Sequence, residues 1–484
     1  MSEQSIIVTV IMLYMALTVF MGLYLSKRKQ DKLAKQSNDD FLMASKSLGP
    51  LVLAATLFAA NTGGASTLGV ANNVRTQGLS SAWYVIAAGI GFFLVSFIAP
   101  YFRRSRSSTV PGIIGKRYGK ASHIFTAVTS IAALFMATGA QIIGTGSIIS
   151  VLAGIDFRTA AIISTAVVIL YTMLGGYKSV ASANILHTIA IVFGMAIAMV
   201  IIVNRVGGFD ALFAKANEMS AAPGSVDLLS MSAVGIPTII GYIAMYCFTF
   251  PTGQEIVQAY CSAKDAKSAK TGSLLAALIS AVYGMIPAVI GLAAVTFIDG
   301  FGPGRNALAE ASIAFAPPII AGIVLASIVA ATMSSASGNM IGTATMFTND
   351  IFRPYINKGV QDEQKEILIS RITMVTIGVV GLLIAIGARN IISVMMAAFA
   401  LRSAGPFAAF VCGLFYKGVT ARAGFLSILV GTLVAVIWIF VLDTPWGLAA
   451  MVPGGLVAFI AIFVISAIDR ANGVAPLPEL ELED

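Results

Sequence analysis

Long apolar segments dominate this sequence, and a chain of this kind can fold only where those segments are removed from water. A helix needs about 20 mostly apolar residues to cross a bilayer, and about thirteen segments reach that length. Their approximate ranges are 5–26, 50–73, 79–101, 121–152, 158–175, 181–203, 231–258, 271–298, 318–347, 367–388, 391–415, 422–442 and 447–468. Only 11% of the 484 residues are charged, against about a quarter in soluble proteins. The sequence therefore predicts an all-α integral membrane protein.

Basic residues are distributed unevenly between the connecting loops. Lysine and arginine favour cytoplasmic loops, and most of the 30 basic residues fall in the loops on one side of the predicted bundle. The opposite side holds Arg75, Arg158, Arg205, Lys215, Arg305 and Arg389. This bias places the N-terminus outside and the C-terminus in the cytoplasm, in a plasma or inner membrane. It also accounts for the net charge of +8, so no nucleic-acid partner is predicted.

Two of the segments contain residues that interrupt a helix. Gly63 and Gly64 lie inside segment 50–73, and Pro251 and Gly253 lie inside segment 231–258. A break at mid-membrane leaves carbonyl groups that must face a cavity, an ion or another helix. Broken segments at corresponding positions of two halves indicate a transporter built from inverted repeats, although a small-residue packing face is the alternative for the glycine pair.

The spacing of the two breaks predicts a division of the chain into a 5+5 repeat with additions at both ends. The predicted parts are an extra N-terminal transmembrane helix and cytoplasmic loop (1–47), a first repeat (48–204), a second repeat (231–416), two further transmembrane helices (417–470) and a flexible acidic cytoplasmic tail (471–484).

Segment 318–347 carries neutral oxygens at a spacing that suits a small cation. The carbonyl of a helical residue points toward the side chains three and four positions later, so the Ala331 carbonyl and the Ser334 and Ser335 hydroxyls converge. Carbonyls from the broken segment 50–73 would complete five-coordination of Na⁺. The alternative is that the serines bond back to their own helix.

Charged groups are nearly absent from the predicted membrane core. Arg402 is the one charge deep in a segment, and no acid in the core is expected to pair with it, because Glu255 is placed near a cytoplasmic end. Arg402 is therefore expected to meet an anionic substrate group, a wet vestibule or helix-end carbonyls. The absence of a buried carboxylate or histidine favours Na⁺ over H⁺ as the coupling ion.

Five stretches, in order along the chain, resemble the sodium:solute symporter family from Phe41 to about Gly431. They are Phe41 to Gly49 (FLMASKSLG), Tyr171 to Val180 (YTMLGGYKSV), Gln254 to Lys264 (QEIVQAYCSAK), Met333-Ser334-Ser335 followed by Asp350-Ile351-Phe352, and Gly413 to Lys417 (GLFYK). The resemblance implies a LeuT-like inverted-repeat core, sodium-coupled uptake and alternating access.

Carried over by position, the resemblance also implies site residues. The sodium site falls on the carbonyls of Ala59, Thr62 and Ala331 and the hydroxyls of Ser334 and Ser335. The substrate site falls near Asn61, Gly63, Thr67, Thr249, Phe250 and Gln254, and Arg402 is added from the charge argument above. Sugar-transporting members carry a gating Tyr and a Trp where this chain has Thr249 and Phe250, which argues against a sugar.

A second departure bears on ion stoichiometry. The family often has Thr-Asp where this chain has Ala183-Asn184, and Gly338 replaces a serine. We therefore expect one Na⁺ per cycle. The predicted protein is not an enzyme. It is a sodium-coupled symporter, functional as a monomer, of a small polar metabolite, with a carboxylate-bearing solute such as a monocarboxylate or amino acid favoured. A proton-coupled permease or a non-transporting sensor is the alternative.

Overall fold

The computed structural model describes residues 5–14, 16, 17, 20, 46–104, 107, 109–302, 305–388 and 391–478, without the side chains of 171, 174–180, 182 and 183. Within these residues the chain is helical, and the β-type contact is a single bridge between Leu48 and Ala263. Most of the predicted loop up to residue 47 and the tail beyond residue 478 lie outside the described residues.

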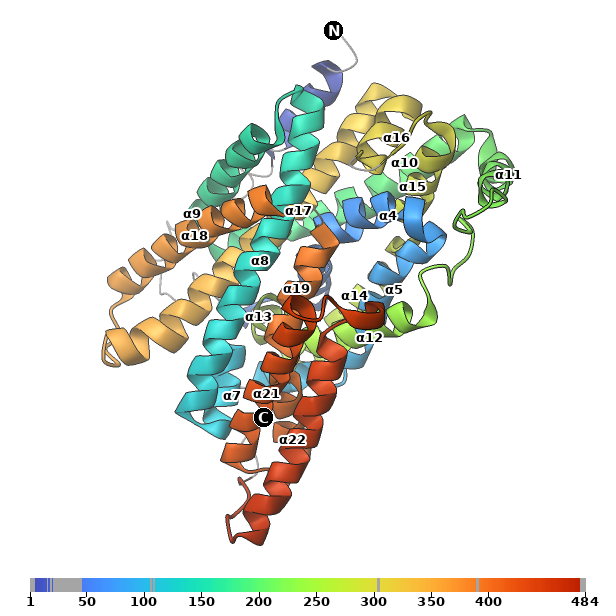
Figure 1. Cartoon of the computed structure of the whole chain (residues 1–484). Helices are drawn as coiled ribbons and strands as arrows, with labels where there is room; N and C mark the ends of the chain where they lie inside the picture. The colour runs from blue at the N-terminus through green and yellow to red at the C-terminus, as the bar shows by residue number, and fades with distance from the viewer. Residues whose placement is uncertain are drawn as a thin grey trace.

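The first half of the chain forms long helices joined by short ones (Figure 1). Their bounds are α3 (Pro50–Asn61), η2 (Ala65–Gly69), α4 (Val70–Gln77), η3 (Gly78–Ala82), α5 (Trp83–Val95), α6 (Ala99–Arg104), α7 (Val110–Tyr118), α8 (Lys120–Ala153), α9 (Phe157–Ile189), η4 (Ala190–Gly194), α10 (Met195–Arg205) and α11 (Gly208–Ser220).

The second half has a similar make-up and ends in two long helices that pack together, α21 and α22. The bounds are α12 (Ile236–Thr249), α13 (Gln254–Cys261), α14 (Ala266–Tyr283), α15 (Met285–Phe297), α16 (Ala307–Phe315), α17 (Pro318–Met346), η5 (Phe347–Ile356), α18 (Glu363–Gly387), α19 (Ile391–Ser403), α20 (Pro406–Phe415), α21 (Ala421–Phe440), η6 (Pro445–Gly447) and α22 (Met451–Ala471).

Fewer helices span a full bilayer thickness than the sequence predicts. Among the described residues, eight helices are long and apolar enough to cross a membrane, or nine if the bent pair α19 and α20 is one span. Shorter apolar helices occupy the remaining predicted segments: Ser5–Tyr14, Pro50–Asn61, Phe157–Leu170 and Ile236–Thr249. The shortfall has a physical cause in segments 50–73 and 231–258, where each helix is interrupted before it has crossed.

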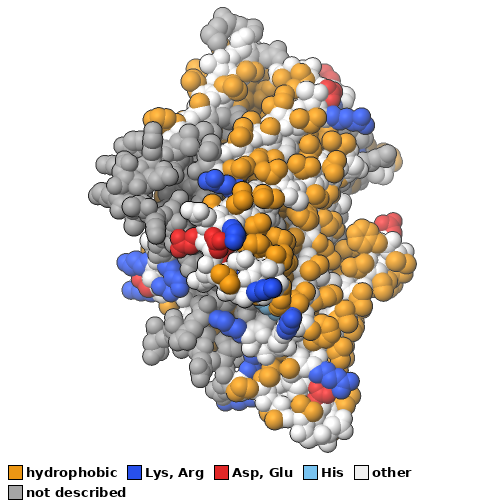
Figure 2. Space-filling model, turned by 90° about the vertical axis from the view of Figure 1, so that its left-hand side faces the viewer, with side chains coloured by type: hydrophobic (Ala, Val, Ile, Leu, Met, Phe, Trp, Pro, Cys, Tyr) orange, Lys and Arg blue, Asp and Glu red, His pale blue; other side chains and the backbone are white. Residues whose placement is uncertain are grey.

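Two groups of helices enclose the centre of the molecule. Helices α8, α9, α17 and α18 pack on one another and are called the frame here, while α3, α5, α12 and α14 form a second group, called the bundle (Figure 1). Apolar side chains cover a broad part of the outer surface (Figure 2), including Leu278, Leu383 and Ile460, each more than half exposed. Such a surface suits lipid rather than water.

Both predicted helix breaks are present. Helix α3 ends at Asn61, and the chain resumes as the π-helical turn η2 from Ala65. Helix α12 ends at Thr249, and α13 starts only at Gln254, after an extended Gly253. The glycine pair is therefore a true interruption and not a packing face of an unbroken helix.

Candidate functional site

The end of α3 meets the middle of α17, which brings the bundle and the frame together. The Ser335 hydroxyl donates a hydrogen bond to the Ala59 carbonyl at 3.0 Å. Thr62 is fully buried at the break, and its hydroxyl has no hydrogen-bond partner among the described residues. Ala331 is also fully buried, one turn before Ser335 on α17. Ser335 thus bonds across to α3 and not back to its own helix.

Ser334 points to a different neighbour. Its hydroxyl donates to the amide oxygen of Asn184 on α9, and the Ser337 hydroxyl donates to the Ser334 carbonyl at 2.9 Å. These groups are all buried and neutral. The two serines of α17 therefore have different partners: Ser335 bonds to the broken helix α3, and Ser334 bonds to α9 of the frame.

Gln141 of α8 holds the far side of the first break. Its side-chain oxygen accepts a hydrogen bond from the Gly64 amide at 2.9 Å. A Cβ added at Gly63 would overlap the same side chain, so a larger residue there would displace Gln141. Sequence reasoning missed Gln141, although a glutamine inside the apolar segment 121–152 was a usable signal.

A small cavity of about 10 Å³ lies directly beside this break; it has room for about one water molecule, so it must widen to admit a solute. Its lining residues come from α3, α8, α12–α13, α17 and α19: Ala60, Asn61, Ala137, Gln141, Phe250, Glu255, Ile256, Asn339, Met395, Phe399 and Arg402. The amide nitrogen of Asn61 is buried there without a hydrogen-bond partner in the described structure. An unpaired buried donor is costly, so this cavity is suited to a ligand that carries an acceptor.

The expectation that Arg402 lacks an acidic partner is wrong. The Arg402 guanidinium pairs with the Glu255 carboxylate, Nη1 to Oε2, at 2.7 Å, and both side chains are buried. The guanidinium also lies over the Phe399 ring, 4.8 Å from its centroid. Because α12 stops at Thr249 and the chain restarts at Gln254, Glu255 sits in the core instead of at a cytoplasmic helix end.

Of the other predicted substrate residues, Phe250 lines the cavity, whereas Thr67, Thr249 and Gln254 have other partners. Thr67 bonds back to the Gly63 carbonyl at 2.8 Å, and Thr249 lies 3.5 Å from the Ser403 hydroxyl. Gln254 accepts a hydrogen bond from the Val110 amide at 3.0 Å. Phe250 lines the cavity and stacks on Phe92 with ring centroids 4.0 Å apart. Asn61, Phe250 and Arg402 are thus brought together, while Thr67, Thr249 and Gln254 are not among the lining residues.

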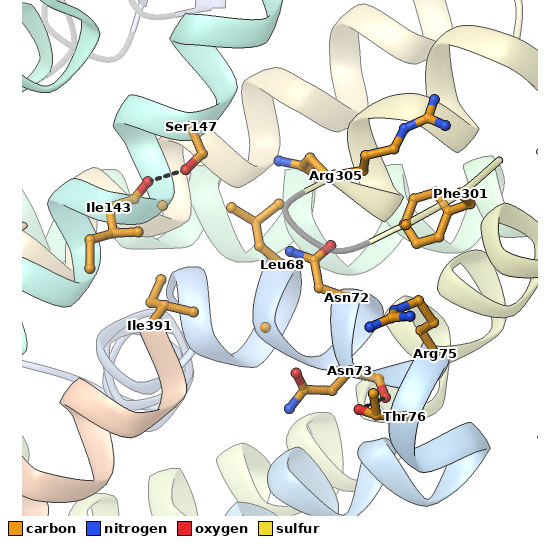
Figure 3. Close-up of a pocket in the computed structure, with 14 residues that line it drawn as sticks. Leu68, Asn72, Asn73, Arg75, Thr76, Ile143, Ser147, Phe301, Arg305 and Ile391 are labelled. Carbon is orange, nitrogen blue, oxygen red and sulfur yellow. Dashed lines mark hydrogen bonds between the residues drawn. The ribbon is translucent and has the colours of Figure 1, made fainter. Parts of the chain in front are cut away.

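A larger, open pocket of about 360 Å³ lies one helical turn away from this cavity, on the side that carries Arg75 and Arg305 (Figure 3). We call it the vestibule. Along α8 its lining includes Gly144 where the cavity has Gln141, and along α19 it has Ile391 where the cavity has Met395. One turn of helix is about 5.4 Å, so a thin layer separates the two spaces.

Ile391 forms the tightest part of that layer. A Cβ added at Gly64 would lie 2.6 Å from the Ile391 Cδ1 atom and 3.3 Å from the Gly144 Cα atom. The broken segment, α8 and α19 therefore meet without space between them. The cavity is closed toward the vestibule by this contact of an isoleucine with two glycines.

Comparisons with known proteins agree with this arrangement. The model of the sodium:solute symporter family matches residues 41–431. The osmoregulated proline transporter OpuE of Bacillus subtilis (strain 168) is 24% identical over 475 residues, which cover 95% of this chain and 94% of the relative. The sodium/glucose cotransporter of Vibrio parahaemolyticus is 25% identical over 453 residues, covering 87% and 82%.

Solved structures show the same fold. The substrate-bound outward-open state of a Na⁺-coupled sialic acid symporter matches with a TM-score of 0.79 at 19% identity, covering 98% of this chain and 99% of that one. The nucleobase-cation symporter Mhp1 matches with a TM-score of 0.57 at 15% identity, covering 90% and 96%. The all-helical LeuT-like fold predicted from the sequence is thereby confirmed.

The family match covers most of the chain, and it places the broken helices, the neutral oxygens and the enclosed cavity in one context. It also confirms that the molecule is a transporter and not an enzyme. The chain belongs to the sodium:solute symporter family and is an integral membrane, Na⁺-coupled solute symporter.

Proposed function

We propose that this protein takes up a small amino acid together with one Na⁺ by alternating access. The observation that carries the proposal is the contact between the Ser335 hydroxyl and the Ala59 carbonyl at 3.0 Å. It joins the frame to the bundle at the helix break, beside the enclosed cavity. An ion bound at this point would favour the arrangement of the two groups in which the solute can bind.

The sodium ligands proposed are the carbonyls of Ala59, Thr62 and Ala331 and the hydroxyls of Ser334 and Ser335. All of these residues are buried, and their donor atoms are neutral oxygens, which suit a hard monovalent cation. On ion binding, Ser335 would exchange its hydrogen bond to Ala59 for a shared contact of both oxygens with Na⁺. Ser334 would turn from Asn184 toward the same ion.

One Na⁺ per cycle is proposed because the region on the far side of Ser334 is neutral. Asn184 presents an amide to Ser334, and Gly338 has no side chain to contribute. A second cation would find few free ligands there, because the Asn184 amide oxygen already accepts from Ser334 and Gly338 offers no hydroxyl. One charge moving inward at 100 mV supplies about 2.3 kcal/mol, so a single ion can drive accumulation. Sodium activation of uptake should follow a Hill coefficient of 1.

The solute class follows from the ion pair. Arg402 and Glu255 together carry no net charge, and both line the cavity with the unpaired amide nitrogen of Asn61. A zwitterion can meet both partners, its carboxylate at Arg402 and its ammonium at Glu255, whereas a simple monocarboxylate leaves Glu255 unbalanced. Relatives described as proline transporters point the same way, so we propose an amino acid.

Proton coupling is the second candidate, and Glu255 is the observation that favours it. A buried carboxylate is the group that a proton relay needs, and the sequence had placed none in the core. Glu255 is already engaged by Arg402 at 2.7 Å, which weakens this candidate. The two mechanisms are separated by uptake of radiolabelled L-proline and other amino acids into proteoliposomes.

The decisive comparison replaces external Na⁺ with choline at fixed pH, and then varies pH at fixed Na⁺. Loss of uptake in choline, with little response to a pH gradient, supports the sodium mechanism. Uptake that persists in choline and follows the pH gradient contradicts it. A thermal-shift screen of small metabolites with and without Na⁺ would identify the solute if proline is not the substrate.

We also propose an orientation with the N-terminus outside and the C-terminus in the cytoplasm of a plasma or inner membrane, and a functional monomer. The vestibule then opens to the outside, because Arg75 and Arg305 lie on the side poor in basic residues. The repeats proposed are 48–204 and 231–416. Accessibility of single cysteines introduced at Arg75 and at Arg470 to an impermeant reagent in intact cells tests the orientation.

A further inference from the structure

The first turn of α13 presents different faces to different neighbours. Glu255 and Ile256 line the central cavity. Gln254 and Gln258 are four residues apart, so they lie on the same side of the helix. Their side chains bond to α7 and α17 and are not among the residues that line the cavity. A short helix of eight residues thus connects the cavity to another part of the protein.

The two glutamines bond to groups outside the bundle. The Gln254 side-chain oxygen accepts from the Val110 amide, the first residue of α7, at 3.0 Å. The Gln258 side-chain nitrogen donates to the Thr345 hydroxyl of α17 at 3.1 Å. Both glutamines and Thr345 are at most 1% exposed, so water does not substitute for these bonds.

The N-terminus of α7 is itself fixed to the frame. The Thr109 hydroxyl, which caps α7, donates to the Asp350 carboxylate at 2.8 Å. The His123 ring nitrogen lies 2.8 Å from the same carboxylate oxygen. Asp350 follows α17 in η5, and His123 is in the first turn of α8. Because α7 is fixed to the frame in this way, the hydrogen bond between Val110 and Gln254 links α13 to the frame.

We propose that Gln254 and Gln258 are positioning residues that hold the protein closed on the side of α7, and that the ion pair of Glu255 couples their release to solute in the cavity. The proposal rests on the proposed function of the cavity as the solute site. A solute carboxylate that competes for Arg402 weakens the bond to Glu255. The first turn of α13 is then free to move, and Gln254 and Gln258 move with it.

The expected size of the effect is set by the hydrogen bonds. A buried hydrogen bond of this kind shifts a two-state equilibrium by roughly twofold to tenfold. A solute that binds the open state tenfold more tightly than the closed state shifts the equilibrium between them tenfold. The binding of one small solute can therefore release a closure held by these two hydrogen bonds. Stronger closure would trap the solute, and weaker closure would let Na⁺ pass alone.

The experiment is hydrogen–deuterium exchange, read by mass spectrometry, on the full chain in lipid nanodiscs. The variant Gln254→Ala removes the acceptor for the Val110 amide. The matched control is Tyr260→Phe, which removes a hydrogen bond of α13 that stays on the bundle side, from Tyr260 to Ser273 at 2.7 Å.

We expect Gln254→Ala to speed exchange roughly twofold to tenfold in the peptides of both α7 and α13, the range that one such bond allows. Tyr260→Phe should leave α7 as in the wild type. Glu255→Gln should speed exchange in α7 even though it touches neither glutamine contact. Unchanged exchange in α7 and α13 of Gln254→Ala, or an equal effect of Tyr260→Phe, would overturn the proposal.

Two further measurements keep the result interpretable. If Gln254→Ala unfolds, seen as faster exchange in α21 and α22, Thr345→Val removes the contact of Gln258 from the frame side and must speed exchange in α13 instead. Wild-type protein is also compared in sodium and choline chloride, with and without L-proline. Protection of α3 by sodium tests the proposed function alone, so its failure is distinguishable from failure of the closure.

Discussion

Polar contacts stabilise both helix breaks, but the chemistry of these contacts differs between the two. The first, after Asn61, is held by neutral groups: the Ala59 carbonyl bonds to Ser335, and the Gly64 amide bonds to Gln141. The second, before Gln254, is held by a buried ion pair between Glu255 and Arg402. Neutral oxygens can release and rebind an ion at low cost, whereas a buried charge must always keep a partner. We infer that the first break serves the ion and the second serves the solute.

The largest expected effect is at the charged break. Arg402→Gln leaves Glu255 buried without a partner, and breaking a buried pair costs about 3–5 kcal/mol. We expect a clear fall in melting temperature and complete loss of uptake of an amino acid in proteoliposomes. The double variant Arg402→Gln with Glu255→Gln should recover the melting temperature but not the uptake. Wild-type uptake by the double variant would show that the pair is structural only.

A smaller effect is expected at the neutral break. Ser335→Ala and Ser334→Ala each remove one proposed ligand, which should raise the sodium concentration for half-maximal uptake roughly tenfold to hundredfold, since a hydrogen bond or ligand contact to a charged group contributes about 1.5–3 kcal/mol. Ser335 should show the larger change because it already contacts Ala59.

The matched control for the serine variants is Ser327→Ala. Ser327 lies on the same helix and is equally buried, but its hydroxyl bonds to Ile323 of its own helix and to Ala190. Its replacement should leave the sodium requirement unchanged. Sodium activation that is the same in all three variants would mean that the ion binds elsewhere.

The smallest expected effect concerns the support of the first break. Gln141→Leu leaves the Gly64 amide without its acceptor, which costs about 1–3 kcal/mol of stability and should lower the melting temperature modestly. Thr138→Val is the control on the same helix, because within the described part of the chain the Thr138 hydroxyl bonds only to Leu134 of its own helix. Equal melting of the two variants would mean that Gln141 does not hold the break.

Local patterns in the sequence were sufficient to predict the fold class and both breaks. The run of apolar residues, the glycine pair and the Pro251–Gly253 pair are each contained within a few positions, so their physical consequence does not depend on distant contacts. The same holds for the polar stretch from Ala331 to Ser335. Ser335 could be recognised from this polar stretch, and Ala59 was named from the family resemblance.

The solute cavity was harder to predict because its chemistry depends on distant residues. Glu255 and Arg402 are 147 positions apart, and Glu255 enters the core only because the helix is interrupted before it. The sequence argument predicted this interruption but still placed Glu255 near the cytoplasmic end of the segment, as in a continuous helix. Gln254 was assigned to the substrate site from the family resemblance, although its side chain faces α7.

The contact of Ile391 with Gly64 and Gly144 has a consequence for the kinetics of transport. On that side the partly exposed Ile391 side chain packs on the Gly64 and Gly144 backbones in one thin layer, and exposed side chains change rotamer in picoseconds to nanoseconds. On the side of α7, closure involves whole helices, whose collective motions take microseconds to milliseconds. Bound solute should therefore swap with solute in the external medium many times for each molecule delivered inside, and radiolabel exchange should outpace net accumulation.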